Sequence, residues 1–243
     1  MSNRRISITR HLQSLVGERH PHSAPESLTK AAQYLTAQFS EYGWMTTHQV
    51  FRAWGKVYRN ILAVKHPAGR GVRDKQAPLL IGAHYDTVAA SPGADDNASA
   101  LVVLLEVADR LKRAAVTRPV WLVAFCLEEH GLLGSQAFVA RLKKTGHSPV
   151  GAIILECVGY ASHEVGSQRI PPGVPIPVPT VGNFLGIVGN EASQHLVEAI
   201  ERGCRQISPS QLPTLALTVP SRGEALPDIR RSDHAAFWDE GYS

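Results

Sequence analysis

Three short apolar runs, each followed directly by histidine or acidic residues, constrain the fold of this chain most. The runs and their polar residues are 79–83 with His84 and Asp86, 120–127 with Glu128 and Glu129, and 150–155 with Glu156. Such runs, alternating with helical patterns, are typical of strands buried on both faces of a largely parallel sheet. Because ligands bind at the carboxyl ends of such strands, we expect the polar residues to converge at one edge of the sheet.

The other segments also fit an α/β protein. Strands are expected at 47–51, 60–64, 183–189 and 215–219, and helices at 24–42, from Asn97 as a cap to about Arg113, and at 191–206. The Gly- and Pro-rich stretch 159–180 is expected to be a long loop over the active face. A length of 243 residues suits one domain covering 1–243.

Charge and composition argue against several classes of partner. The formal charge is +4, the pI is ≈ 9.1, and the basic residues are scattered, so we expect no nucleic-acid partner. No apolar run is long enough to span a bilayer, and the basic N-terminus lacks the apolar stretch of a secretory signal. We therefore predict no membrane association and a cytoplasmic location. Oligomeric state is not predicted.

The cysteines give no metal or disulfide pattern. Their number is 3 and they are widely spaced, which argues against a disulfide framework and against a thiolate zinc site. Cys126 and Cys157 lie in apolar runs and are expected to pack in the core.

His84 and Asp86 are two residues apart, so their side chains point the same way in an extended strand. One can bind a metal while the other accepts the remaining ring N–H, an arrangement that orients metal-binding histidines. Taken alone, the pair is more often a half-buried histidine beside an acid at a strand end.

The remaining acids strengthen the metal interpretation when taken together. Asp96 could simply cap the following helix, but a second carboxylate, Asp95, lies beside it and would benefit from a cation. Adjacent Glu128 and Glu129 point in different directions, which suits one metal ligand and one proton acceptor, although two solvated acids are the simpler alternative. Glu156 follows a buried run, where an unpaired carboxylate is costly. One histidine with several carboxylates suits Zn²⁺ or a similar ion in a hydrolase.

Four motifs resemble those of a known family in order and spacing. They are His84-Tyr85-Asp86, Gly93-Ala94-Asp95-Asp96-Asn97-Ala98-Ser99, Glu128-Glu129-x-Gly131-Leu132-x-Gly134-Ser135 and Ser232-Asp233-His234. The chain resembles the co-catalytic di-zinc aminopeptidases of metallopeptidase family 28, clan MH. The resemblance implies a three-layer α/β/α sandwich around a mixed, largely parallel central sheet. It also implies a zinc-dependent exopeptidase, foremost an aminopeptidase, that hydrolyses N-terminal bonds of a peptide substrate by metal-activated water.

The resemblance also implies roles for individual residues. His84 and Glu156 would bind the first zinc, Asp96 would bridge both ions and Glu129 would bind the second. Glu128 would be the general base, and Asp86 would be the partner of His84. Many relatives have aspartate where this chain has Glu156.

The C-terminus departs from the family pattern. Relatives continue beyond the Ser232–Trp238 segment with a strand and a histidine that ligates the second zinc, whereas this sequence ends at Ser243. We therefore expect either a C-terminally truncated domain or a compromised second site that keeps only Glu129 and Asp96. The alternatives are a glutaminyl-cyclase-like transferase with one zinc, or an inactive scaffold that binds peptide or metal. The Glu128–Ser135 motif favours the peptidase.

Overall fold

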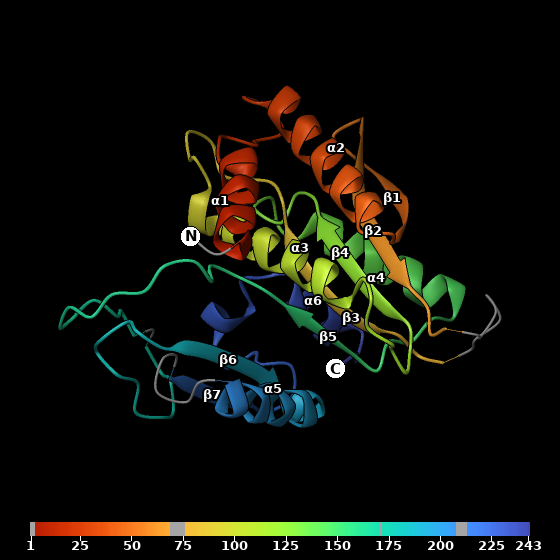
Figure 1. Ribbon diagram of the computed structural model, residues 1–243. Helices are drawn as coiled ribbons and strands as arrows, with labels where there is room; N and C mark the ends of the chain where they lie inside the picture. Colours follow the sequence, from red (N-terminus) through yellow and green to blue (C-terminus); the bar gives the residue numbers. More distant parts are fainter. Residues whose placement is uncertain (1–2, 69–75, 171, 208–212) are drawn as a thin grey trace.

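The computed structural model describes residues 3–68, 76–170, 172–207 and 213–243. Its main sheet has five strands in the order β1-β2-β4-β3-β5 (Figure 1). These strands are β1 (Met45–Ala53), β2 (Lys56–Lys65), β3 (Leu79–His84), β4 (Val120–Phe125) and β5 (Gly151–Ile154). β3 pairs in parallel with β4 and β5, whereas β2 pairs antiparallel with β1 and β4. The predicted mixed sheet is confirmed, with its parallel part formed by β4, β3 and β5.

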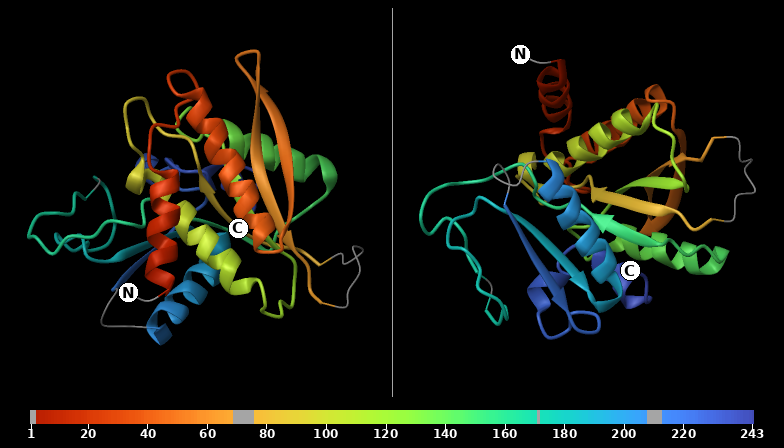
Figure 2. Two further views of the ribbon diagram at one scale, coloured as in Figure 1. Left: turned by 45° about the horizontal axis from the view of Figure 1, so that its top comes forward. Right: turned by 60° about the horizontal axis from the view of Figure 1, so that its bottom comes forward.

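Helices cover both faces of this sheet (Figure 2). One face packs against α2 (Pro25–Glu41) and α3 (Ala100–Leu111), and the other against α4 (Leu133–Thr145) and α6 (His234–Asp239). α1 (Asn3–Leu15) packs against α2 and α3. The predicted α/β/α layering is therefore confirmed.

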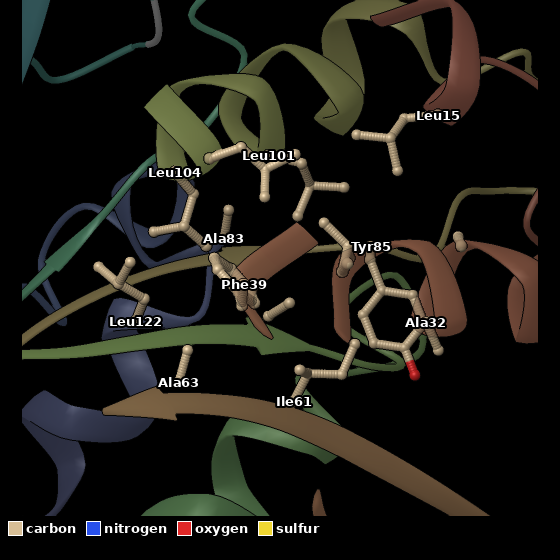
Figure 3. Packing of buried hydrophobic residues seen from close by; sticks show 14 of the residues in the cluster. Leu15, Ala32, Phe39, Ile61, Ala63, Ala83, Tyr85, Leu101, Leu104 and Leu122 are labelled. Atoms are coloured by element: carbon tan, nitrogen blue, oxygen red, sulfur yellow. The ribbon is translucent and has the colours of Figure 1, made fainter. Parts of the chain in front are cut away.

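The larger apolar core lies between the sheet and α1, α2 and α3 (Figure 3). Its labelled side chains are Leu15, Ala32, Phe39, Leu101 and Leu104 from the helices and Ile61, Ala63, Ala83, Leu122 and Tyr85 from the sheet and the strand end. Burying each large apolar side chain contributes roughly 1.5–3 kcal/mol before conformational entropy is subtracted. This core fixes the position of β3 and β4, whose carboxyl ends carry the polar residues.

A second, two-stranded parallel sheet follows β5. It contains β6 (Leu185–Asn190) and β7 (Thr214–Val219), joined through η2 (Glu191–Ser193) and α5 (Gln194–Ile207). The predicted strand, helix and strand are present here. Beside it, the main-chain oxygen of Ser243 accepts a hydrogen bond from Ala152 N–H of β5 at 2.8 Å.

The described residues between β5 and β6 form neither helix nor strand, as predicted for 159–180. Val174 and Ile176 of this segment pack against Leu217, Val219 and Trp238. This part of the loop therefore packs on β7 and α6. Its expected position over the active face stays a prediction. Among the described helices, none is both long and apolar enough to cross a membrane.

Candidate metal centre

The carboxyl ends of β3, β4 and β5 bring the predicted polar side chains together. His84 ends β3, and its Nε2 atom lies 3.1 Å from Asp96 Oδ1, 3.3 Å from Glu156 Oε1 and 3.8 Å from Glu128 Oε2. Asp96 comes from η1 (Ala94–Ser99), the turn that precedes α3. We call His84, Asp96, Glu128, Glu129 and Glu156 the polar cluster.

The donor atoms of this cluster have the spacing of metal ligands. Three groups each have all donor atoms within 4.8 Å of one another: His84, Glu128 and Glu156; His84, Asp96 and Glu129; and Asp96, Glu156 and Cys157. Nitrogen and carboxylate donors at this spacing suit a divalent ion such as zinc. The residues present therefore fit a metal centre.

Asp86 connects the ends of β3 and β4. Its fully buried carboxylate accepts the main-chain N–H of Glu128 at 3.0 Å and of Glu129 at 3.2 Å. His84 Nδ1 lies 3.2 Å from the main-chain oxygen of Asp86 and 3.6 Å from its Oδ1. Asp86 thus lies beside the ring nitrogen directed away from the cluster, with its main-chain oxygen nearer than its carboxylate, and its carboxylate holds the backbone of both glutamates.

Asn97 holds the segment that carries Glu156. Its side-chain amide donates to the Leu155 carbonyl at 3.1 Å and accepts Cys157 N–H at 3.2 Å. The predicted helix cap at Asn97 is wrong, because this side chain bonds to the end of β5 and α3 begins at Ala100. Glu156 is further held by Ser232, whose hydroxyl donates to Oε2 at 2.7 Å.

Asp95 anchors the same segment from another side. Its Oδ1 accepts Gly159 N–H at 2.7 Å, and the Ser99 hydroxyl accepts Val158 N–H at 3.1 Å. The carboxylate of Asp95 therefore bonds to the backbone, whereas the carboxylate of Asp96 lies beside His84.

Burial and crowding of carboxylates shift the ionisation of the cluster. Burial raises the pKa of Glu128 to about 9, with Asp233 and Glu156 adding to the effect and His84 opposing it. Burial alone would lower the pKa of His84, but hydrogen bonds with Asp86, Asp96 and Glu156 raise it well above its usual value. The raised pKa values of Glu128 and His84 are those expected where carboxylates crowd together, and a divalent cation would neutralise their charge.

Asp86 behaves in the opposite way. Burial opposes its ionisation, but the neighbouring His130 and His84 and the Glu128 N–H hold the pKa of its carboxyl well below the usual range. Without a bound cation, the pKa of Asp86 is therefore lowered while that of Glu128 is raised. This separation of pKa values by environment is typical of sites that move protons.

Asp233 also belongs to this site, although its sequence context predicted no role for it. It is fully buried, and neither of its oxygens makes a hydrogen bond of good geometry within the described ranges. Burial raises the pKa of Asp233 to about 7, and its proximity raises that of Glu128. The Ser232-Asp233-His234 motif was the available signal, but the sequence does not indicate that this acid is buried beside Glu128.

The cysteines differ from each other in position. Cys126 is buried, as predicted. Cys157 is exposed, so its predicted place in the core is wrong. The strand ends at Ile154, before Cys157 is reached, and the backbone of Cys157 is left-handed with a φ of +46°. Its Sγ lies 3.5 Å from Glu156 Oε1.

An aromatic cluster borders the polar cluster at the turn between β1 and β2. The ring of Trp54 lies 5.4 Å from that of His130 and 5.0 Å from that of His22, measured between centroids. His130 Nδ1 is in turn 3.8 Å from Asp86 Oδ2. The turn between β1 and β2 therefore packs against His130, the residue that follows Glu129.

A cavity of ≈ 520 Å³ adjoins the polar cluster. Apolar residues of β5, β6 and α5, among them Ile153, Leu185 and Leu196, form much of its wall, and Glu128 and Glu156 lie at its polar end. A molecule bound in this cavity would therefore contact both apolar side chains and the carboxylates.

Comparison with known proteins identifies several similar chains. Residues 60–243 match the model of peptidase family M28. The chain is 32% identical over 237 residues to the uncharacterized protein YfbL of Escherichia coli, covering 90% of this chain and 68% of that protein. Further curated relatives, several named aminopeptidases, align over less than half of their own length.

Two solved structures are informative. BSAP, a zinc aminopeptidase from Bacillus subtilis, is 26% identical with a TM-score of 0.57, covering 78% of this chain and 39% of that one. A glutaminyl cyclase from Porphyromonas gingivalis has a TM-score of 0.67 at 19% identity, covering 98% of this chain and 79% of that one. The second likeness concerns the fold alone.

Proposed function

This chain belongs to peptidase family M28, and we infer that it is a zinc-dependent exopeptidase, specifically an aminopeptidase that cleaves the N-terminal bond of peptides. The observation that carries this proposal is the convergence of His84, Asp96, Glu129 and Glu156 at the ends of the strands. Aminopeptidases among the relatives support the direction of cleavage.

The donors of the polar cluster would be divided between a first zinc site and an incomplete second one. His84 and Glu156 would hold one zinc, Glu129 would hold the other, and Asp96 would be shared between them. When bound, zinc polarises the scissile carbonyl and lowers the pKa of water. Ser232 and Asn97 hold Glu156 and its segment in place for this role.

Glu128 would act as the general base. It is buried at the polar end of the cavity, 3.8 Å from His84 Nε2, where it can take a proton from the attacking water and pass it to the leaving amine. Burial raises the pKa of Glu128 when no cation is bound, and a bound cation would favour the ionised form that accepts a proton. Asp86 would be a positioning residue that aligns His84 and both glutamates.

Release of free N-terminal amino acids from short peptides tests the proposal. A chelator should abolish release and added zinc should restore it, whereas release that is insensitive to chelator would contradict the assignment. Glu128→Gln should lower kcat by about 10²-fold or more with zinc still bound, because it removes proton transfer. Glu198→Gln, on an exposed face of α5, is the matched control and should retain full activity.

The same assay separates peptide hydrolysis from cyclisation. With a peptide that begins with glutamine, hydrolysis shortens the chain by one residue, whereas cyclisation releases ammonia and leaves its length unchanged. Product masses dominated by the cyclised peptide would contradict the aminopeptidase assignment.

A further inference from the structure

Cys157 stands beside two of the carboxylates in the proposed zinc centre. Its sulfur lies 3.5 Å from Glu156 Oε1, and donor atoms of Asp96, Glu156 and Cys157 are all within 4.8 Å of one another. Cys157 also lines the ≈ 520 Å³ cavity and is exposed, so an ion can reach its sulfur. The thiol therefore has the position of a ligand, although the sequence alone favoured a core residue.

The backbone fixes this position. Asn97 bonds to the Leu155 carbonyl and to Cys157 N–H, so the segment containing Glu156 and Cys157 is held at both ends by one side chain. Asp96 immediately precedes Asn97 in η1, so Asn97 connects Asp96 to the segment that carries Glu156 and Cys157. Cys126 is buried and Cys204 belongs to α5, so neither offers an equivalent position.

We propose that Cys157 supplies a sulfur ligand to the metal centre, together with Asp96 and Glu156. The proposal rests on the proposed zinc function. On binding, the thiol releases its proton to solvent and a metal–sulfur bond forms, with no electron transferred. A thiolate donor favours zinc, cobalt or cadmium over magnesium or manganese, whose preferred ligands are oxygen atoms.

Cobalt(II) titration of the metal-free protein tests this directly. Visible d–d bands report that the ion binds, and a near-ultraviolet sulfur-to-cobalt charge-transfer band reports a thiolate ligand. The wild type should show both. Cys157→Ser should keep the visible bands and lose the near-ultraviolet band, while the control Cys204→Ser should keep both.

The outcomes separate this proposal from the function on which it rests. Visible bands without a near-ultraviolet band in the wild type, or an unchanged near-ultraviolet band in Cys157→Ser, would overturn the sulfur ligand and leave the zinc centre intact. Failure of the wild type to show visible bands at all would overturn both.

A second measurement needs no variant. Alkylation of the wild type by iodoacetamide, followed by peptide mass spectrometry, gives the rate at each cysteine with and without Zn²⁺. Because a metal-bound thiolate is blocked, zinc should slow alkylation of Cys157 by about tenfold or more and leave Cys204 unchanged as the internal control. Equal rates at Cys157 under the two conditions would overturn the proposal.

Discussion

Asn97 shows how one side chain determines the geometry of its neighbours. Its amide makes two main-chain bonds that flank Glu156, at 3.1 and 3.2 Å. Asn97→Ala should lower zinc affinity by about 10–100-fold, the usual effect of removing a group that orients a ligand. It should also cost about 1–3 kcal/mol of unfolding free energy, because main-chain groups lose their partner. Competition with a chelator of known affinity measures the first effect.

Asn190→Ala is the matched control for this prediction. Asn190 is also buried, and its side chain accepts Ser193 N–H at 3.0 Å at the start of η2, away from the polar cluster. This variant should lose a similar amount of stability with unchanged zinc affinity. Equal losses of affinity in both variants would show that Asn97 acts only through stability.

The sequence indicates the candidate metal donors more readily than the residues that hold them in place. His84, Glu128 and Glu156 follow apolar runs, where an unpaired polar group is costly, so their position alone indicates a function. Asn97 precedes a helix, and capping is the ordinary local role of asparagine there. Its bonds to Leu155 and Cys157 become visible only in the folded chain, where the end of β5 lies beside Asn97.

Among the elements, α4 begins in close contact with the backbone that follows β4. A Cβ added to Gly134 would lie 2.1 Å from the carbonyl oxygen of Cys126 and 2.6 Å from Asn60 Oδ1. Asn60 bonds to both sides of this contact, donating to the Gly134 carbonyl at 2.8 Å and accepting Cys126 N–H at 2.9 Å. The start of α4 is therefore packed directly on backbone that leads to Glu128.

Gly134→Ala should lower the free energy of unfolding by about 1–3 kcal/mol or more, because backbone must move to admit the methyl group. Gly203→Ala in α5 is the control, since no atom lies within 4 Å of its added Cβ. That change should raise stability by about 0.5–1 kcal/mol, as expected for a helical glycine. Urea unfolding measures both, and equal effects would contradict the close-packing argument.

Periodicity predicted the elements with continuous apolar patterns and missed the others. The expected helix at 24–42 is α2, and the run before His84 is β3. α1 was not predicted, although Ile8, Leu12 and Leu15 lie at helical spacing and pack against the core, because polar and basic residues dominate the rest of this segment. Its buried His11 bonds to the hydroxyls of Tyr34 and Tyr42, a contact between elements that no local pattern encodes.

For the molecule as a whole, the buried acids predict how stability depends on pH when no metal is bound. The pKa of Glu128 rises from 4.5 to about 9 on folding, and that of Asp233 from 3.8 to about 7. Between these values the folded state binds more protons than the unfolded state. The free energy of unfolding should therefore fall as pH rises from about 5 to 9, by up to about 1.4 kcal/mol per pH unit for each proton.

Thermal unfolding in chelator between these pH values measures the slope. Glu128→Gln should flatten it, because glutamine does not titrate, and saturating zinc should oppose the loss by binding the ionised form. A melting temperature that rises with pH in chelator, or an identical slope in the variant, would contradict this account.

The arrangement of the strands was only partly predictable. Apolar runs indicated buried strands, but they do not show that β2 pairs antiparallel with β4, or that β6 and β7 form a separate sheet. Strand order is set by contacts between distant segments, which a local pattern does not contain. That residues 1–243 act as one domain, in the cytoplasm, stays a prediction.

Tyr85 lies between His84 and Asp86, yet its ring belongs to the interior and its hydroxyl donates to the Arg59 carbonyl at 2.8 Å. Successive side chains of an extended strand face opposite sides. A single stretch of backbone therefore separates the hydrophobic core from the polar cluster. Substitutions in the core beside Tyr85 that are made to raise thermal stability would therefore also shift the imidazole of His84. Replacing Tyr85 with a smaller side chain should therefore weaken metal binding before it unfolds the protein.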